Sequence, residues 1–259
     1  MITSAAIKGK AAELGFDLCG IAPADRFPEL EFLDEWLARG YAGEMTYLSR
    51  SVERRADVRA VVPGARSVIV TGTLYNSGPE PREAPECAVI ARYAWGDDYH
   101  DVLKKRLEAL LAWMRAESPD PFEARAYVDT GPVQERVYAQ YAGLGWIGKN
   151  TCLINAGLGS WLFLAEIICT LPLDPDAQGL EQCGTCRRCL DACPLGLEPD
   201  QVSIRLEVGR TLDTAIYGPL DCYECGSCSY VCPSGRPLMQ FMQVAKSALR
   251  HAGELGIAR

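Results

Sequence analysis

The pattern of apolar positions along the chain predicts strands and helices in alternation. Short apolar runs rich in β-branched residues indicate buried strands, and aromatic residues in a run of strand length favour the same assignment. Four segments fit this description: Arg66–Tyr75, Cys87–Trp95, Phe122–Asp129 and Trp161–Thr170. For Trp161–Thr170 a buried helix is the alternative.

Apolar residues at helical spacing predict helices before, between and after these strands. The helix predicted over Pro132–Ala142 has a proline in its first turn, and Gly143, a typical helix-ending residue, follows it. The predicted helices are Met1–Gly15, Asp97–Glu117, Pro132–Ala142 and Pro237–Ala258. Strands and helices of this kind predict an α+β fold.

Composition narrows the class of protein. The chain has 259 residues, of which 48% are hydrophobic and 23% charged, as in ordinary globular proteins. Its formal net charge is −8, which gives no sign of the clustered Lys and Arg of a nucleic-acid surface. The longest apolar run, Trp161–Leu173, contains Glu166 and is too short to cross a bilayer. Without a secretory signal, we expect a cytoplasmic protein with no membrane span.

Cysteines are concentrated near the end of the chain. Eight of the twelve lie between Cys183 and Cys232, and in a reducing compartment such a density indicates metal binding rather than disulfides. The segment Pro172–Gly179 reads as a linker before them. The sequence therefore predicts three parts: 1–176, 177–238 and a C-terminal helix over 239–259. The remaining cysteines are expected to be small buried hydrophobes without a further role: Cys19, Cys87, Cys152 and Cys169.

The eight clustered cysteines form two copies of C-x2-C-x2-C-x3-C, each followed by proline. This spacing is typical of two-cluster ferredoxins, in which the fourth cysteine of each array ligates the other cluster. The pattern predicts one [4Fe-4S] cluster on Cys183, Cys186, Cys189 and Cys232, and a second on Cys222, Cys225, Cys228 and Cys193. Structural zinc is the alternative, but a third cysteine at this spacing and a trailing Cys-Pro are unusual for zinc sites.

The sequence of a glycine-rich segment, Gly143–Thr151, matches the dinucleotide-binding pattern G-x-G-x-x-G and nearly matches the phosphate-binding loop G-x-x-x-x-G-K-[ST]. It follows a predicted helix rather than a strand, and Asn150 replaces the hydroxyl residue of a phosphate-binding loop, so neither pattern has its required context. One interpretation is a turn that ends a helix at Gly143. The other is a backbone that approaches a large flat ligand closely, which glycine permits.

Asp129 is a candidate acid because it lies where a predicted strand ends and a Gly-Pro turn begins. On these residues alone, the favoured interpretation is that Asp129 caps the helix predicted to start near Pro132.

Five segments in order resemble the epoxyqueuosine reductase family, cobalamin-dependent iron–sulfur enzymes related to reductive dehalogenases. The resemblance covers about residues 5–195, and it is carried by RYAWGDDYH (Arg92–His100), YVDTGPVQER (Tyr127–Arg136), AGLGWIGKNT (Ala142–Thr151), GSWLFLAEI (Gly159–Ile167) and CGTCRRCLDACP (Cys183–Pro194).

The resemblance implies a nitroreductase-like α/β sandwich that binds base-off cobalamin, followed by a ferredoxin-like module with two [4Fe-4S] clusters. It further implies single electrons from a ferredoxin or flavodoxin, reduction of cobalt to Co(I), and completion of queuosine in tRNA. The family's proton-donating aspartate matches Asp129, whose role as an acid would require a raised pKa.

The same resemblance points to several positions that would contact the corrin. These are Arg55, Arg92 and the loop Leu153–Ser160, including Asn155 and Ser160, besides Asp129 itself. The alternatives are ion pairing for the arginines and a plain turn for the loop. His100, at a predicted helix start, has a local hydrogen-bonding role as its simpler interpretation.

Two departures from the family keep other functions open. The chain ends at Arg259, where the family continues into helical repeats that help to grip tRNA, and Cys222–Lys246 resembles cluster segments of membrane-associated electron-transport subunits. The sequence therefore predicts a short-form reductase whose substrate is tRNA or another molecule. The alternatives are an iron–sulfur electron-transfer module and a corrinoid-reducing or corrinoid-loading partner.

Overall fold

The computed structural model describes residues 2–39, 42, 45–76, 92–149, 152–186, 197, 199–222 and 238–254. The chain divides into two compact units. The first comprises Met1–Ile147 and Leu153–Leu180, and the second comprises Gly148–Cys152 and Glu181–Arg259.

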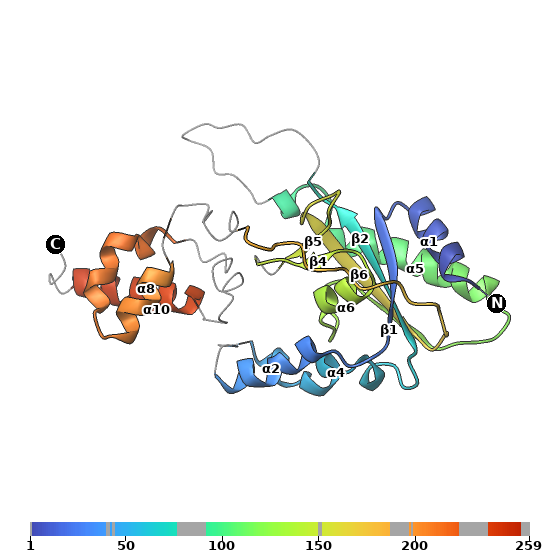
Figure 1. The fold of residues 1–259 in the computed structure, drawn as a ribbon, viewed down its shortest axis with the longest axis horizontal. Coiled ribbons are helices and arrows are strands. Elements are labelled where there is room, and N and C mark those ends of the chain that lie inside the picture. Colours follow the sequence, from blue (N-terminus) through green and yellow to red (C-terminus); the bar gives the residue numbers. More distant parts are fainter. Residues whose placement is uncertain are drawn as a thin grey trace. The chain divides into compact units, whose positions relative to one another are not determined.

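A four-stranded antiparallel sheet organises the first unit (Figure 1). Its order is β1-β2-β6-β3, so the two long central strands, β2 and β6, are each paired on both sides. These central strands carry the most continuous apolar runs, as expected for strands buried on both faces. The strands are β1 (Leu18–Pro23), β2 (Ser67–Leu74), β3 (Ala124–Tyr127) and β6 (Leu162–Cys169).

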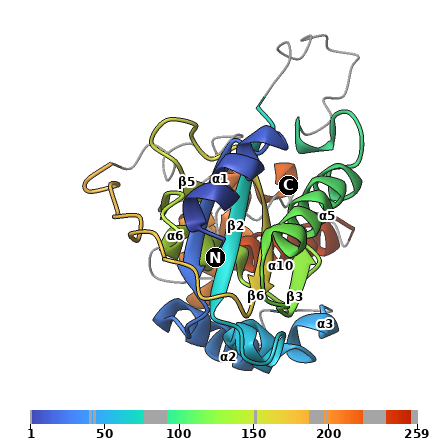
Figure 2. The ribbon, with the colours of Figure 1, turned by 90° about the vertical axis from the view of Figure 1, so that its right-hand side faces the viewer.

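Helices cover both faces of this sheet. In Figure 2, α6 lies to the left of β2 and α5 to its right. The helices on the α5 side are α1 (Ser4–Glu13) and α5 (Tyr99–Glu117). Those on the α6 side are α2 (Pro28–Ala38), α4 (Val52–Ala56) and α6 (Glu135–Tyr141). Shorter pieces are α3 (Thr46–Ser49), η1 (Val58–Ala60) and η2 (Arg92–Ala94).

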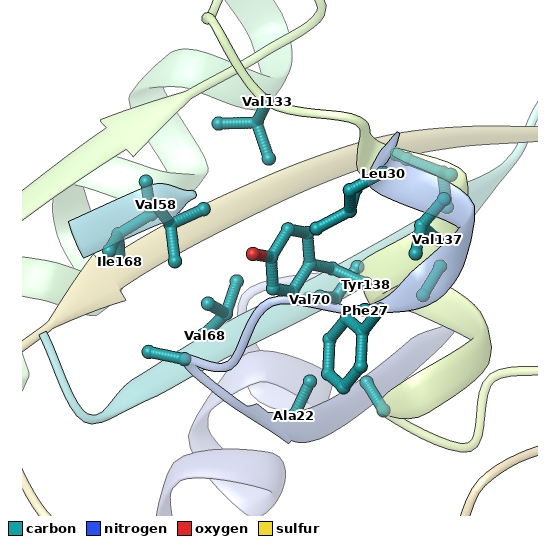
Figure 3. Close-up of a cluster of buried hydrophobic side chains, with 14 of the residues drawn as sticks. Ala22, Phe27, Leu30, Val58, Val68, Val70, Val133, Val137, Tyr138 and Ile168 are labelled. Carbon is teal, nitrogen blue, oxygen red and sulfur yellow. The ribbon is translucent and has the colours of Figure 1, made fainter. Parts of the chain in front are cut away.

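Alternation along the strands divides the core into two layers. Val68 and Val70 of β2 pack on the α6 side, around Tyr138, which is fully buried (Figure 3). Ile69, between them, packs on the α5 side against leucines of that helix. Because Tyr138 donates its hydroxyl to the Asp25 carbonyl at 3.0 Å, its one polar atom is satisfied within the core.

The second unit is helical in its described part. Its elements are α8 (Pro199–Glu207), η3 (Thr211–Tyr217), η4 (Pro219–Asp221) and α10 (Leu238–Glu254). A small core joins α8 to α10 through Val202, Met242 and Ala245. None of the helices in the ranges given above is long and apolar enough to cross a bilayer.

Most of the predicted elements are confirmed within a few residues of their ends. The strand expected over Cys87–Trp95 is wrong in its described part, since Arg92–Ala94 forms a 3-10 turn, and residues 87–91 lie outside the described residues. The helix predicted from Pro132 begins only at Glu135. The segment read as a linker is packed against the first unit, where Asp176 accepts the Ile21 N–H at 2.8 Å.

Candidate active site

Asp129 lies in a tight turn directly after β3. It is the one residue other than glycine in the described chain with a positive φ, 57°, a conformation that aspartate tolerates better than most residues. The Thr130 N–H donates to the Val128 carbonyl at 2.5 Å. Gly131 completes the turn, because a Cβ there would lie 2.6 Å from Cγ of Tyr127. The sequence Asp-Thr-Gly thus folds back over the end of β3.

The Asp129 carboxyl is directed toward the start of α5. Tyr99 donates its hydroxyl to Oδ2 of Asp129 at 2.6 Å, and Nε2 of His100 lies 3.6 Å from the same oxygen. The side chain is 60% exposed, so a ligand can reach it. Burial and the hydrogen bond to Asp129 raise the pKa of Tyr99, which keeps its hydroxyl a donor throughout the physiological pH range.

The interpretation of Asp129 as a helix cap is wrong. The capping residue of α6 is Gln134, which makes no side-chain cap hydrogen bond. The relation is the reverse: the Asp129 N–H donates to Oε1 of Glu135 at 2.8 Å. The turn is longer than the sequence indicated, and the helix that follows supplies an acceptor to Asp129 instead of receiving one.

His100 has the local role that its position suggested. Asp98 caps α5 by accepting the His100 N–H at 2.9 Å, and the same oxygen lies 2.8 Å from Nδ1 of the imidazole. These hydrogen bonds from His100 lower the pKa of Asp98. The arrangement fixes the ring beside Tyr99, whose ring centroid is 4.0 Å away.

A row of aromatic rings connects Asp129 with Arg92. Tyr99 stacks on Phe163 with centroids 4.1 Å apart, and Phe163 contacts Tyr75 at 4.4 Å. Tyr75 in turn meets Trp161, and the Arg92 guanidinium lies 5.6 Å from the centre of that indole. Arg92 also lies 5.2 Å from the ring of Trp95 and hydrogen-bonds Asn76. Two of the predicted site residues therefore lie at opposite ends of one surface.

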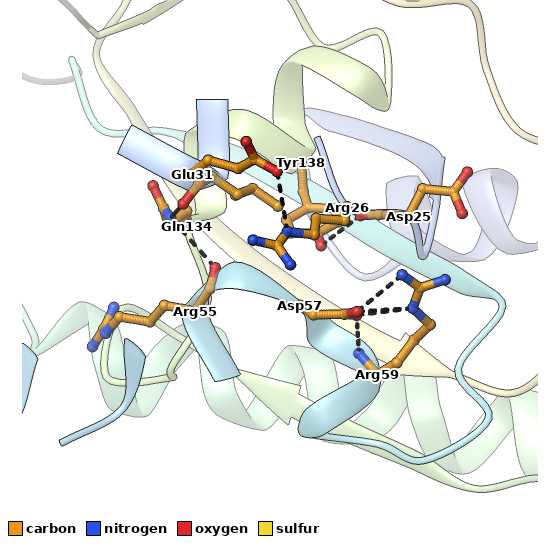
Figure 4. Close-up of polar contacts among 9 residues, drawn as sticks. Asp25, Arg26, Glu31, Arg55, Asp57, Arg59, Gln134 and Tyr138 are labelled. Atoms are coloured by element: carbon orange, nitrogen blue, oxygen red, sulfur yellow. Dashed lines mark hydrogen bonds and ion pairs between the residues drawn. The ribbon is translucent and has the colours of Figure 1, made fainter. Parts of the chain in front are cut away.

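Arg55 is in a different environment on α4. Its Nε donates to Oγ of Ser51 at 3.0 Å, and its guanidinium lies 5.9 Å from the ring of Tyr47. Its carbonyl accepts from Nε2 of Gln134 at 3.3 Å, and Gln134 also donates to the Leu30 carbonyl. In Figure 4 the Arg55 side chain extends away from Gln134. The structure thus joins α2, α4 and the start of α6 beside the Asp129 turn.

The predicted corrin loop, Leu153–Ser160, is organised by Asn155. Its Nδ2 donates to the Leu144 carbonyl at 2.7 Å, and its Oδ1 accepts the N–H groups of Gly157 and Leu158 at 2.9 and 3.1 Å. Leu153 is 4% exposed and packs in the core. The Asn155 side chain therefore folds the loop itself, which is the turn-forming role of asparagine.

The glycine-rich segment is a helix end followed by a hairpin. Gly143 has a φ of 75° and donates to the Gln140 carbonyl at 3.1 Å, which confirms the helix-ending interpretation. A Cβ on Gly145 would overlap the Ile154 carbonyl, and one on Gly179 would overlap the Gly145 carbonyl. These glycines allow close approach of the protein's own backbone. The hairpin strands are β4 (Trp146–Ile147) and β5 (Leu153–Ile154).

A cavity of about 290 Å³ lies at the opposite end of α6 from Asp129. It is lined in part by Cys19 and Asp176, and burial raises the pKa of the Cys19 thiol to about 12. Cys169 is fully buried, with a pKa raised to about 11 by burial. Neither thiol is activated as a nucleophile. Cys169 is buried as expected, whereas Cys19 is only partly buried and lines the cavity.

Three of the eight predicted cluster cysteines are described, all in the second unit. The Cys186 N–H donates to the Cys183 carbonyl at 2.8 Å, which closes a turn around Gly184. Lys149 secures this turn by donating to the carbonyls of Gly184 and Cys186 at 2.6 and 3.1 Å. Cys222 ends η4. Cys189, Cys193, Cys225, Cys228 and Cys232 lie outside the described residues.

Residue patterns missed three polar residues around Asp129: Tyr99, Glu135 and Glu166, of which Glu166 is fully buried in β6 near Glu135. Tyr99 and Glu135 lie within segments that also carry His100 and Asp129. The amino-acid sequence of these segments does not distinguish a polar side chain that contacts Asp129 from one that faces solvent. Glu166 did give a signal, since it is an acid inside an otherwise apolar strand run, and such residues are rarely buried without a partner.

Comparison with known proteins agrees with both parts of the sequence assignment. A family model described as "Epoxyqueuosine reductase QueG, DUF1730" matches residues 55–130, and one described as "4Fe-4S dicluster domain" matches residues 181–236. The second match confirms the predicted iron–sulfur character of the cysteine arrays over the zinc alternative.

Curated relatives cover most of the chain. The epoxyqueuosine reductase of Gloeobacter violaceus is 50% identical over 207 residues, which are 78% of this chain and 64% of that protein. The epoxyqueuosine reductase of Synechocystis sp. is 40% identical over 241 residues, 87% of this chain and 82% of that protein. The chain thus spans less than two thirds of the first of these relatives.

Solved structures give the same result. A crystal structure of epoxyqueuosine reductase with a tRNA-Tyr epoxyqueuosine-modified stem loop is similar with a TM-score of 0.65 at 25% identity, over 90% of this chain and 67% of that one. The structure of epoxyqueuosine reductase from Bacillus subtilis, with its catalytic aspartate loop swung out of the active site, is similar with a TM-score of 0.63 at 25% identity. The match covers 89% of this chain and 64% of that one. Because one curated relative is 40% identical and covered over 82% of its length, the chain belongs to the epoxyqueuosine reductase family.

Proposed function

We propose that this protein reduces the epoxide of an epoxyqueuosine-type nucleoside to an alkene, with Asp129 as proton donor. In this reaction both epoxide C–O bonds break, a C=C bond forms, and the oxygen leaves as water after accepting two protons, while two electrons enter. The observation that carries the proposal is the Asp129 turn, which presents an exposed carboxyl held through one oxygen by Tyr99.

The geometry suits an acid. The Tyr99 hydroxyl occupies Oδ2 of Asp129, so the carboxyl is oriented while its other oxygen can carry a proton to a ligand. The Bacillus subtilis relative is described with a catalytic aspartate loop that leaves its active site, which supports the same role for the Asp129 turn. Tyr99 is a positioning residue in this scheme.

Two [4Fe-4S] clusters would deliver the electrons one at a time. The thiols of Cys183 and Cys186 lie on one tight turn, as thiolate ligands of one cluster would, so the described residues fit the group. The crossed ligand sets remain our assignment: Cys183, Cys186, Cys189 and Cys232 for one cluster, and Cys222, Cys225, Cys228 and Cys193 for the other.

Cobalamin would supply a strongly reducing, nucleophilic metal centre when bound. The aromatic surface beside Asp129 fits such a ligand, because Trp161 and Tyr93 are 44% and 55% exposed next to the Arg92 cation. Flat apolar faces with a cation at the edge suit a large ring that carries amide groups. Arg55, Leu153, Asn155 and Ser160 remain predicted contacts, of which Leu153 is buried.

We assign residues 1–176 to a nitroreductase-like sandwich that binds cobalamin, 177–238 to a ferredoxin-like module and 239–259 to a C-terminal helix. The substrate proposed is the anticodon stem-loop of a tRNA, as in the stem-loop complex of the relative. The electron donor proposed is a ferredoxin or flavodoxin, since each donates single electrons to iron–sulfur clusters.

Cobalamin binding separates an enzyme from an electron-transfer module. Protein reconstituted with iron and sulfide should bind cob(II)alamin and give a base-off electron paramagnetic resonance signal, without nitrogen splitting from a lower ligand. Failure to bind would leave the electron-transfer module as the better assignment.

Asp129→Asn tests the acid directly. The variant should lose turnover of an epoxyqueuosine stem-loop while cob(II)alamin is still reduced by the clusters. Asp120→Asn, an exposed aspartate beyond α5, is the matched control and should behave as the wild type. Wild-type turnover in Asp129→Asn would remove this residue from the mechanism. A gel shift with the stem-loop at low salt, where phosphate contacts are strongest, checks tRNA binding separately.

A further inference from the structure

Two glutamates meet beneath the Asp129 turn. Glu166 lies in the middle of β6, opposite Val70 of β2 and Tyr127 of β3, and its side chain is fully buried. Its neighbours along β6 pack on the α5 side of the sheet, so Glu166 faces the α6 side. There it meets the carboxyl of Glu135, which lies in the first turn of α6.

The chemistry of this contact requires a proton. Neither carboxyl oxygen of Glu166 has a partner that is itself a hydrogen-bond donor among the described residues. The Glu135 carboxyl is the neighbour that most affects the charge of Glu166. Two carboxylates only accept, so they can hydrogen-bond to each other only when one of them is protonated. Two neighbouring negative charges, one of them on the fully buried Glu166, would also be strongly unfavourable.

The charges around the pair support this reading. Burial and the nearby Asp129 carboxyl raise the pKa of Glu135 to about 7, and burial and Glu135 raise the pKa of Glu166 well above its ordinary value. Among the described residues, Arg136 is the cation that favours the charged form of Glu135. Tyr99 and His100, on α5, contact the Asp129 carboxyl, and the charge of Glu135 also contributes to the raised pKa of Tyr99.

The pair is connected to Asp129 by a hydrogen bond. Oε1 of Glu135 accepts the Asp129 N–H at 2.8 Å, at the residue whose φ is 57°. A left-handed conformation costs a residue with a Cβ about 1 kcal/mol or more, so it persists only where its surroundings hold it. The Glu135 carboxylate stabilises the Asp129 backbone by accepting its N–H, and Tyr99 stabilises the Asp129 side chain by donating to its carboxyl.

We propose that Glu135 and Glu166 are a proton-sharing carboxyl pair that positions the Asp129 turn for proton donation. Protonated Glu166 donates to Glu135, which keeps the Glu135 carboxylate aimed at the Asp129 N–H. When the last shared proton leaves, the two charges repel and Glu135 loses its donor, so the turn is released. The inference rests on the proposed function of Asp129 for its catalytic consequence, whereas its structural part concerns this chain alone.

Two variants of Glu166 separate positioning from general packing. Glu166→Gln keeps a donor toward Glu135 but cannot lose it with rising pH. It should retain turnover within about three-fold at neutral pH, and it should lack the alkaline decline that the wild type shows as the pair deprotonates. Glu166→Leu fills the space without a donor and should reduce kcat about ten-fold or more with little change in KM.

Hydrogen exchange of the Asp129 amide tests the pair without any substrate. Its protection factor, corrected for the intrinsic pH dependence of exchange, should fall above neutral pH in the wild type, stay constant in Glu166→Gln and be low at every pH in Glu166→Leu. Protection that is independent of pH in the wild type, or unchanged in Glu166→Leu, would overturn the proposal.

These readouts also separate the two claims. If Asp129 protection in the wild type does not depend on pH but turnover is normal, the carboxyl pair is contradicted and the proposed function is not. Normal pH-dependent protection in a protein that never turns over the stem-loop would contradict the proposed function alone. Should Glu166→Leu fail to fold, the comparison of Glu166→Gln with the wild type is decisive by itself, because a flat protection profile in one and not in the other is required.

Discussion

At the scale of single residues, the structure shows how an exposed aspartate is held in one orientation. Asp129 lies where the end of β3 meets the starts of α5 and α6. Tyr99 from α5 contacts its carboxyl and Glu135 from α6 contacts its N–H, at 2.6 and 2.8 Å. An acid fixed by two elements is pre-organised for proton transfer.

Tyr99→Phe removes the hydroxyl that orients the Asp129 carboxyl and keeps the ring stacked on Phe163. A hydrogen bond to a charged group contributes about 1.5–3 kcal/mol, so kcat should fall roughly ten- to hundred-fold with little change in KM. Steady-state kinetics with the stem-loop measure it. Tyr141→Phe, at the other end of α6 from Asp129, is the control. An unchanged kcat would show that Tyr99 does not orient the acid.

Stability should depend on pH through Glu135. Its pKa rises from 4.5 to about 7 on folding, so the folded state binds more protons than the unfolded state between these values. The free energy of unfolding therefore decreases as pH rises from about 4.5 to about 7. Glu135→Gln should flatten this part of the melting-temperature profile, whereas exposed Glu117→Gln should not. Parallel profiles for Glu135→Gln and the wild type would contradict the assignment.

At the scale of elements, close backbone approach fixes how the hairpin and the returning chain pack beneath α6. The Gly179 backbone packs so closely against the Gly145 carbonyl that a Cβ would overlap it, and Gly145 packs in the same way against the Ile154 carbonyl. Gly179 also donates its N–H to the Gln140 carbonyl at 2.9 Å. Three segments that are distant in sequence are therefore in contact through glycine.

Two glycine substitutions should have opposite effects. Gly179→Ala would force the Gly145 backbone to move, and we expect it to lower the free energy of unfolding by about 2 kcal/mol or more. Gly9→Ala lies in α1 with nothing within 4 Å of the new Cβ, and it should stabilise by about 0.5–1 kcal/mol. Thermal melting of both variants measures the effects. A neutral Gly179→Ala would contradict the close packing.

Periodicity was sufficient for the elements that bury a continuous apolar face. The runs in β2 and β6 and the leucines of α5 predict their elements, because burial determines both their sequence and their structure. The mixed strand β1, with glycine and proline among its six residues, gives no such signal. The start of α6 was misplaced because Pro132 can stand in a turn as well as in a helix.

The candidate site was predictable only where a motif carries it. The cysteine spacing and Asp129 came from motifs, whereas the Glu135–Glu166 pair depends on β6 and α6 being adjacent, which no local pattern encodes. Arg92 was named from the resemblance, but its aromatic surface arises from Tyr75 and Trp161, which are brought together by the sheet.

At the scale of the whole molecule, the proposed function requires electrons to pass from a dicluster domain to a reductase domain. The family match to residues 55–130 and the dicluster match to residues 181–236 place both parts in one chain. Two [4Fe-4S] clusters correspond to about eight irons per chain.

Paired cysteine substitutions test the crossed ligand sets. Cys183→Ser with Cys232→Ser removes two ligands of one cluster in our assignment, so about four irons should remain. Cys183→Ser with Cys193→Ser removes one ligand from each cluster and should destabilise both. Iron and sulfide analysis after reconstitution distinguishes the two. The opposite pattern, with both clusters lost in the first variant and one in the second, would show that each array holds its own cluster.

Reduction of the epoxide tests the central claim most directly. The protein is reconstituted with both clusters and cobalamin and supplied with a single-electron donor. It is then incubated with an epoxyqueuosine-containing stem-loop, and the masses of the digested nucleosides are measured by mass spectrometry. The expected product is a nucleoside that has lost one oxygen atom, and Asp129→Asn should give no conversion. An unchanged nucleoside, from protein shown to carry both clusters and the corrinoid, would contradict it.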